Sequence, residues 1–201
     1  MAEESLVASH PDVAPLLTER AQRAKLLEAM VQVVAEKGYA AATVADAVKL
    51  ARVSRGTFYE LFESKQQCLA TAYKLGVEVL DRRIADAVKD AKDWRDEIRL
   101  GLREYLECLR EEPRFAHVHL LEWEALGRER EDALWHFARR YGKSFARSGR
   151  PVPPDDALYV LSAGIDQLAC ARVRAGEDVT ELEDTLVGCV VRLAPEEEPW
   201  T

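Results

Sequence analysis

Helix start signals recur so closely in the first third of this sequence that only short helices fit between them. Thr43 is followed three residues later by Asp46, and Ser64 is followed three residues later by Gln67, which are the spacings of N-terminal capping boxes. Ser54 lies between the two boxes and can cap a further helix. With the apolar stripe and glycine stop that precede them, these signals predict helices over residues 20–37, 43–51, 55–62 and 64–91.

The rest of the chain also predicts helices, and no stretch alternates apolar and polar residues as a strand would. Breakers at Pro113, Gly127 and Gly149 end three helical patterns, and two more are predicted at 157–175 and 180–193. The predicted fold is therefore all-α with about nine helices. We expect a flexible N-terminal arm over 1–17, a three-helix module over 18–65, a helical domain over 66–194 and an acidic tail over 195–201.

Composition and charge narrow the class of protein. Hydrophobic residues make up 48% of the 201 residues, which is enough to bury a substantial core. The longest uncharged stretch, residues 157–165, is too short to span a bilayer, and the acidic N-terminus lacks a signal-peptide pattern, so we expect a cytoplasmic protein with no membrane partner. The net charge is −8, yet residues 18–65 hold eight Lys and Arg against six Asp and Glu. A mildly basic front module therefore precedes an acidic body.

Two short helices separated by residues 52–54 have the arrangement of a helix-turn-helix, whose second helix lies in the DNA major groove. On the helix at 55–62 the residues Phe58, Leu61 and Phe62 share one face, which we expect to be buried. Arg55 then lies at the end that reaches base edges, where a guanidinium can bind guanine O6 and N7. A helical hairpin whose polar residues only cover a surface is the alternative reading of this spacing.

The run from Arg23 to Lys65 resembles the DNA-binding module of the tetracycline-repressor (TetR) family of bacterial transcriptional regulators. The resemblance is carried by Gly38-Tyr39, Thr43-Val44, Asp46, Val53-Ser54, Gly56-Thr57, Tyr59, Phe62 and Ser64-Lys65. It covers about a quarter of the chain. The DNA-binding residues that the helix-turn-helix pattern and the resemblance predict are Thr43, Ser54, Arg55, Gly56, Thr57, Tyr59 and Lys65.

The sequence departs from the family pattern at several positions. Ala47-Val48 stands where the family commonly has Ile-Ala, and Leu61 replaces a residue that is often polar. Arg52 occupies the turn position that is usually glycine, and only glycine adopts a left-handed backbone there without strain. Glu60 places an anion near the expected phosphates.

The resemblance implies that the second domain is helical, dimerises and binds a small effector. Aromatic residues gather between positions 94 and 145, where they form either a packed core or the walls of a ligand cavity. The predicted ligand-binding residues are His117, Leu121, Trp123, Trp135, Phe137, Asp166 and Gln167. The two C-terminal helices carry more apolar surface than a hairpin needs, and the predicted dimer interface is Leu161, Ile165, Leu168, Leu186 and Val190.

Other chemistries find little support. His117 and His119 lie on opposite sides of a helix, the four cysteines form no C-x-x-C pair, and phosphate-binding loops and nucleophile motifs are absent, so we expect no metal, no cofactor and no enzyme. The sequence predicts a homodimeric repressor that binds a palindromic DNA operator and is released by a small, mainly apolar effector. An effector-independent regulator, a DNA-packing protein and a helical enzyme with an unrecognised site are the alternatives.

Overall fold

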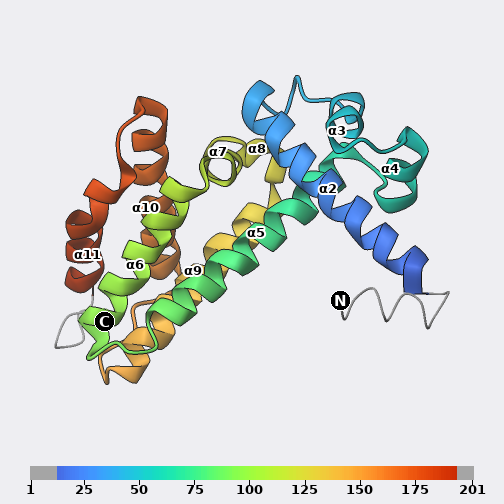
Figure 1. Cartoon of the computed structure of the whole chain (residues 1–201). Helices are drawn as coiled ribbons and strands as arrows, with labels where there is room; N and C mark the ends of the chain where they lie inside the picture. Colours follow the sequence, from blue (N-terminus) through green and yellow to red (C-terminus); the bar gives the residue numbers. More distant parts are fainter. Residues whose placement is uncertain (1–12, 194–201) are drawn as a thin grey trace. The chain divides into compact units, whose positions relative to one another are not determined.

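The computed structural model describes residues 13–193 and divides the chain into two compact units, Met1–Ala72 and Tyr73–Thr201. Every regular element in this described part is helical (Figure 1), which confirms the predicted all-α fold. Helix α2 begins at Val13, so residues 13–17 of the predicted arm are helical, whereas residues 1–12 and the acidic tail 195–201 lie outside the described residues.

The N-terminal unit contains α2 (Val13–Lys37), α3 (Val44–Ala51), α4 (Arg55–Leu61) and the first turns of α5 (Lys65–Ala87). Helix α2 packs on α3, and α3 packs on α4. The core of this unit consists of fully or nearly fully buried apolar side chains: Leu26, Met30, Val34, Ala47, Phe58, Phe62, Cys68 and Leu69. Because Cys68 and Leu69 belong to that core, the unit ends after Ala72 and not at the predicted residue 65.

The predicted helix starts of this unit are confirmed by their capping hydrogen bonds. The Thr43 hydroxyl accepts from the Asp46 backbone N–H at 3.1 Å, and the Asp46 carboxylate accepts from the Thr43 N–H at 3.1 Å. Ser54 Oγ accepts from the Thr57 N–H at 2.9 Å. Each bond satisfies a backbone donor that has no partner within its own helix, and so fixes where the helix begins.

Arg52 ends α3 in the left-handed region, with φ 56° and ψ 42°. Among the described residues it is the one non-glycine residue with a positive φ. This conformation costs a residue with a Cβ roughly 1–2 kcal/mol. The turn between α3 and α4 therefore keeps the shape that glycine would give it, with a strained arginine in its place.

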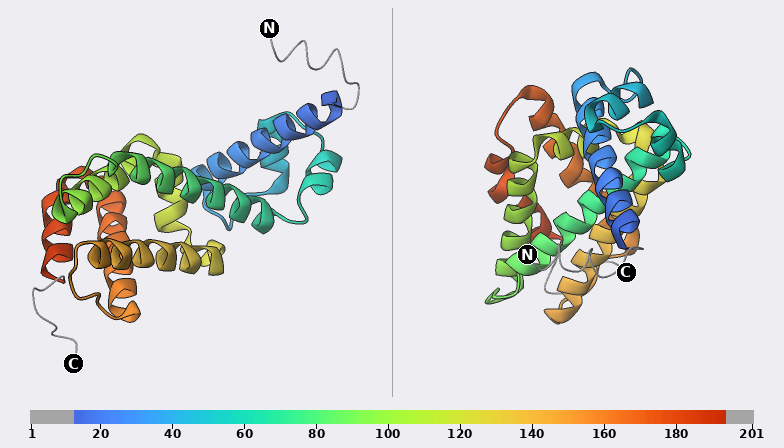
Figure 2. Two further views of the ribbon diagram at one scale, coloured as in Figure 1. Left: turned by 90° about the horizontal axis from the view of Figure 1, so that it is seen from below. Right: turned by 45° about the vertical axis from the view of Figure 1, so that its right-hand side comes forward.

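The C-terminal unit contains the rest of α5 and the helices α6 (Trp94–Glu111), α7 (Pro113–Leu121), α8 (Trp123–Leu126), α9 (Arg128–Arg147), α10 (Asp155–Ala175) and α11 (Glu183–Arg192), with a 3-10 turn, η1 (Val179–Leu182), before α11. Helix α6 lies between α5 and α11 (Figure 1), and α9 packs against α10, which crosses it (Figure 2). Positive-φ glycines end three of the segments, at Gly127, Gly149 and Gly176, where the sequence predicted stops at the first two.

Three predicted boundaries differ from the structure. Helix α5 ends at Ala87 instead of residue 91, and the stretch expected as one helix before Gly127 is divided at Glu122 into α7 and α8. The last predicted helix starts as the 3-10 turn η1, because Asp178 accepts a hydrogen bond from the Thr180 N–H at 2.9 Å and caps it there.

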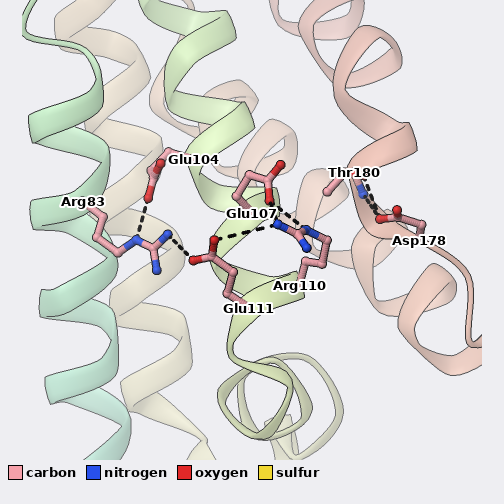
Figure 3. Close-up of polar contacts among 7 residues, drawn as sticks. All are labelled: Arg83, Glu104, Glu107, Arg110, Glu111, Asp178 and Thr180. Atoms are coloured by element: carbon pink, nitrogen blue, oxygen red, sulfur yellow. Dashed lines mark hydrogen bonds and ion pairs between the residues drawn. The ribbon is translucent and has the colours of Figure 1, made fainter.

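Ion pairs join α5 to α6 on the surface of this unit (Figure 3). The Arg83 guanidinium lies 2.5 Å from a carboxylate oxygen of Glu104 and 2.8 Å from one of Glu111, and these acidic residues lie on α6. Arg110 pairs with Glu107 on the same face. Because these groups are partly exposed and solvent screens their charges, the pairs add little to stability, and the apolar core carries most of the packing energy.

The cysteines agree with the expectation of reduced thiols that are mostly packed in cores. Cys68, Cys108 and Cys170 are buried, Cys189 is exposed, and all four are free. Burial raises the pKa of the Cys68 thiol to about 12, which leaves it unreactive near neutral pH. Within the residues that the structure describes, no helix combines the length and the apolar character needed to cross a membrane.

Candidate functional site

Helix α4 separates a buried face from an exposed one. Phe58 is fully buried, and its ring packs against those of Tyr59 and Phe62 with centroid distances of 5.3 and 5.7 Å. Phe62 is also buried, whereas Leu61 is only partly buried, so two of the three residues of the predicted apolar face lie in the core. The Arg23 guanidinium from α2 lies 4.7 Å from the Phe62 ring centroid and holds the end of α4 against the core.

The exposed face of α4 presents Arg55, Gly56 and Tyr59. The Arg55 guanidinium carbon lies 5.7 Å from the centroid of the Tyr59 ring, and half of the Tyr59 surface is exposed. A Cβ added at Gly56 meets only Ser54 Oγ at 3.4 Å, which is an ordinary contact. The fold therefore tolerates a side chain at position 56, and the glycine leaves the surface of the helix open to close approach.

The threonines and serine of the predicted DNA-binding set hold helix ends. Thr43 Oγ1 donates to Asp46 Oδ2 at 2.7 Å, and Thr57 Oγ1 lies 2.9 Å from Ser54 Oγ. Hydrogen bonds from Lys37 and then Thr43 lower the pKa of Asp46 to about 2, so this cap stays ionised in the physiological range. DNA contacts from Thr43, Ser54 and Thr57 remain predictions.

The Lys65 side chain contacts the protein backbone, whereas the sequence predicted that it binds DNA. Its ammonium donates to the backbone oxygens of Tyr39 at 2.6 Å and Ala42 at 2.8 Å, and it lies 3.9 Å from the Tyr39 ring centroid. These contacts close the turn between α2 and α3. The predicted phosphate contact by this side chain thus competes with two protein carbonyls, whereas the backbone N–H groups at the start of α5 stay available for one.

A small cavity of about 50 Å³ lies among α5, α6, α9 and α10 of the C-terminal unit. Its walls are mostly apolar, with Ile84, Ile98, Gly101, Leu102, Phe137, Tyr141 and Ile165. Its polar lining consists of Tyr105, Ser144, Ser162 and Asp166, and Val88, Glu97 and Arg140 complete it. A volume of this size holds a few water molecules, whereas a pocket for a drug-sized ligand has roughly 300–1,000 Å³.

The structure places two of the seven predicted ligand residues, Phe137 and Asp166, in this cavity. The other five lie elsewhere. His117 pairs with Glu122 at 3.3 Å, and Trp123 is 52% exposed, because the chain breaks between α7 and α8 at Glu122.

Leu121, Trp135 and Gln167 are the remaining three. Leu121 is partly buried against the core, Trp135 packs on Tyr159 with a centroid distance of 4.5 Å, and Gln167 is exposed beside the buried Asp166. The stripe Ile98, Leu102 and Tyr105 on α6, at helical spacing, was the sequence signal for the cavity wall that the prediction missed.

Asp166 is the centre of a buried polar cluster. Tyr105 Oη donates to Asp166 Oδ1 at 2.8 Å, and Asp166 Oδ2 lies 3.2 Å from Arg130 Nη2 and 3.4 Å from His119 Nε2. Although Arg130 and His119 lie within ion-pair distance, Oδ2 accepts a hydrogen bond from neither. Burial raises the pKa of Asp166, but the charges of His119 and Arg130 and the hydrogen bonds outweigh it, so the pKa lies below its usual value.

The cluster continues to α5 through His119. Tyr73 Oη lies 3.1 Å from His119 Nδ1, and the imidazole is stacked between the rings of Tyr73 and Phe115, with centroid distances of 5.8 and 5.4 Å. Gly76 makes room for Phe115, because a Cβ at position 76 would come within 2.5 Å of the ring. Five helices, α5, α6, α7, α9 and α10, therefore meet around one carboxylate.

The predicted dimer residues are mostly internal. Leu161, Ile165, Leu186 and Val190 belong to the core of the C-terminal unit and are at most 7% exposed. Leu168 is 39% exposed and shares the outer face of α10 with Val160, which is 68% exposed, and with Gly164. The apolar periodicity that predicted an interface thus describes the packing of α10 and α11 within the unit, and the free surface lies on the opposite side of α10.

Comparison with known proteins agrees with this architecture. Residues 26–72 match the family model described as bacterial regulatory proteins of the tetR family. A fatty acid metabolism regulator protein of Bacillus subtilis is 26% identical over 104 residues, and the match spans 52% of this chain and 54% of that protein, so it covers about half the length of this curated relative.

Solved structures share the whole fold at low identity. FadR, a fatty acid degradation regulator of Bacillus halodurans, and FadR of Bacillus subtilis in complex with stearoyl-CoA each align with a TM-score of 0.75 and 19% identity. Both cover 85% of this chain, with 94% and 98% of their own chains aligned. A TetR-family regulator of Syntrophomonas wolfei aligns with a TM-score of 0.75 and 16% identity. The alignment covers 90% of this chain and 99% of that chain.

The chain shares the fold of these solved structures, with an N-terminal helix-turn-helix module and a second helical unit. Over residues 26–72 its N-terminal unit is similar to the bacterial regulatory proteins of the tetR family.

The exposed face of α4 generates a prediction for DNA reading. Gly56→Ala is expected to leave the free energy of unfolding unchanged or slightly higher, since alanine favours helices over glycine by up to about 1 kcal/mol. It should weaken binding to the cognate operator, because the added methyl group stands where α4 is predicted to meet the groove.

Arg55→Ala should cost roughly 1–3 kcal/mol of binding free energy on the cognate operator and little on scrambled DNA. Urea unfolding measures the free energy of unfolding, and fluorescence anisotropy of labelled DNA measures the affinity for operator and scrambled DNA. Equal losses on the two DNAs for Arg55→Ala contradict base reading by this residue.

The buried carboxylate generates a prediction for pH dependence. Because the folded-state pKa of Asp166 lies below its unfolded value of about 3.9, its stabilising contribution is fully present above that value and is lost as pH falls through the folded pKa. Asp166→Asn should lower the unfolding free energy near pH 7 by about 3–5 kcal/mol. The difference in unfolding free energy between the variant and the wild type should shrink below about pH 4. The exposed Asp132→Asn serves as control in urea unfolding from pH 3 to 7. A difference that stays constant down to pH 3 contradicts an ionised Asp166.

Proposed function

We propose that this protein is a ligand-responsive transcriptional regulator that binds a palindromic DNA operator as a homodimer and is released by a mainly apolar small molecule. The observation that carries the proposal is the combination of a helix α4 whose Arg55, Gly56 and Tyr59 face solvent with a cavity in the second unit. A DNA-binding protein of this kind acts in the cytoplasm. Repression is the expected outcome, because release by an effector then switches genes on.

The homodimer is proposed to form through the outer face of α10. Val160, Gly164 and Leu168 lie there at spacings of four residues, and a Cβ added at Gly164 meets no atom within 4 Å. Exposed apolar and small side chains on one helix face suit close packing against a second copy of the same helix. Two reading helices about 34–36 Å apart then contact successive turns of one DNA face, and the operator has two-fold symmetry.

The effector is proposed to occupy the cavity around Phe137 and Asp166. The FadR relative solved with stearoyl-CoA binds a long apolar chain, and the apolar walls here support an acyl chain as the effector of this protein as well. Since the cavity of about 50 Å³ is far smaller than such a chain, binding requires α5, α6, α9 and α10 to separate.

This requirement supplies a mechanism for release. Helix α5 runs unbroken from Lys65 to Ala87, so it begins in the N-terminal unit and continues into the C-terminal unit. Separation of the helices around the cavity changes how α5 is held by its neighbours, and that change reaches α4 through the start of α5. The effector needs a higher affinity for the opened state, and a coupling of about 1–3 kcal/mol loosens DNA roughly 5- to 150-fold.

Phe137→Ala tests the position of the effector. The truncation removes an apolar wall worth about 1.5–3 kcal/mol when buried, so the stearoyl-CoA concentration that releases half of the operator should rise about tenfold or more. Operator affinity without effector should stay nearly unchanged. Trp123→Ala is the matched control, since this tryptophan is exposed and outside the cavity. Anisotropy of labelled operator gives both quantities, and a tenfold rise for Trp123→Ala without one for Phe137→Ala refutes this site.

The double substitution Val160→Glu and Leu168→Glu tests the assembly. Burying two pairs of unpartnered carboxylates should weaken the dimer on the order of 100-fold and abolish operator binding at nanomolar protein. Val79→Glu changes a comparable exposed residue on α5 and should leave dimerisation and operator binding unchanged. Sedimentation velocity at micromolar concentration distinguishes monomer from dimer. A doubly substituted protein that stays dimeric places the interface elsewhere.

A further inference from the structure

A stripe of cationic side chains follows one face of helix α9 beside the cavity. Its members recur at helical spacing and line a surface groove of about 280 Å³, and they are His136, Arg139, Arg140, Lys143 and Arg147. Asp81 and Ala85 of α5, Val88 and Glu97 form the other side of this groove. Four Lys and Arg thus face two acidic residues, in a chain whose net charge is −8. We call this surface the basic groove.

The basic groove and the cavity meet at a shared rim. Val88, Glu97 and Arg140 line both. One side of that rim is mostly apolar, and the other is mostly polar. A molecule that extends across the rim therefore needs an apolar part and a charged part joined end to end.

Within the groove, two cations are available for a ligand. Asp81 lies 2.9 Å from Arg140 and 3.1 Å from His136, and Glu97 pairs with Arg147. Arg139 and Lys143, in contrast, make no hydrogen bond or ion pair with any residue that the structure describes. Surface lysine and arginine are common, but two unpaired cations beside the paired Arg140 and Arg147 on a single helix face concentrate positive potential at the rim of the cavity.

We propose that the basic groove binds the phosphates of an acyl-CoA-type effector while its acyl chain enters the cavity. A single carboxylate, as in a free fatty acid, needs only one cation. Positions 139 and 147 lie about 12 Å apart along α9, a length that suits several phosphates spread along a nucleotide-diphosphate head. Guanidinium and ammonium groups are the usual protein donors to phosphate oxygens. This inference rests on the proposed effector site and adds the class of the polar head.

The test substitutes Arg139→Gln and Lys143→Gln together. Both side chains are exposed and unpaired in the described part of the chain, so the fold should persist. The control is Arg114→Gln with Arg128→Gln, which removes the same charge from exposed, unpaired positions outside the groove. Calorimetry with stearoyl-CoA, stearate and CoA, at two salt concentrations, gives the affinities of the full-length dimer.

The expected result has three parts. The groove variant binds stearoyl-CoA about tenfold more weakly or worse, and its salt dependence decreases. Its affinity for stearate stays equal to that of the wild type, and so does its affinity for operator DNA. The control variant behaves as the wild type with every probe.

Three outcomes overturn the inference. Equal stearoyl-CoA affinity in the groove and control variants, with effector-dependent release intact, leaves the proposed function standing and removes the phosphate site. A loss of operator affinity in the groove variant equal to its loss of stearoyl-CoA affinity assigns the stripe to DNA contacts instead. Failure of the wild type to bind either acyl compound rejects the acyl effector itself, and the phosphate site with it.

Discussion

A single buried carboxylate organises the second unit of this protein. Asp166 is 6% exposed, and an unpaired carboxylate at such a depth would be strongly unfavourable. It is stabilised by Tyr105, Arg130 and His119, which come from three different helices, and His119 extends the contacts to Tyr73 on α5. Because Asp166 and Tyr105 also line the cavity, a molecule that enters there contacts the groups that hold these helices together. The packing of the second unit thus depends on this one charge, and we propose that the response to an effector does as well.

The first unit is organised by local hydrogen bonds. Its helices are seven to 25 residues long, and the caps at Thr43 and Ser54 together with the Lys65 ammonium determine where they begin and how the turns between them close. The caps need no distant partner, whereas the Lys65 ammonium reaches back to the backbone oxygens of Tyr39 and Ala42, and together they hold the turns around α3 and α4. The proposed dimer depends on this arrangement, because two reading helices find their half-sites only when each presents the same face.

The difference between local and distant causes explains what the sequence predicted. The caps of α3, α4 and α5 follow from residues three apart, and the family resemblance rests on the same positions. The ligand and dimer residues depend on which helix faces which. Trp123 is exposed because the chain breaks at Glu122, a break that no proline or glycine marks. Leu161 and Ile165 form an apolar stripe whether their partner is α9 or another copy of the chain, so periodicity alone did not decide between core and interface.

The central claim is that the effector and the operator favour different states of the same molecule. Thermodynamic linkage makes this reciprocal: if stearoyl-CoA weakens operator binding, the operator must weaken stearoyl-CoA binding by the same factor. The most direct measurement is the dissociation constant of stearoyl-CoA for the free protein and for the protein saturated with operator DNA selected from genomic fragments. We expect the operator-bound protein to bind stearoyl-CoA roughly 5- to 150-fold more weakly than the free protein does. Equal dissociation constants, with both complexes clearly formed, would contradict it.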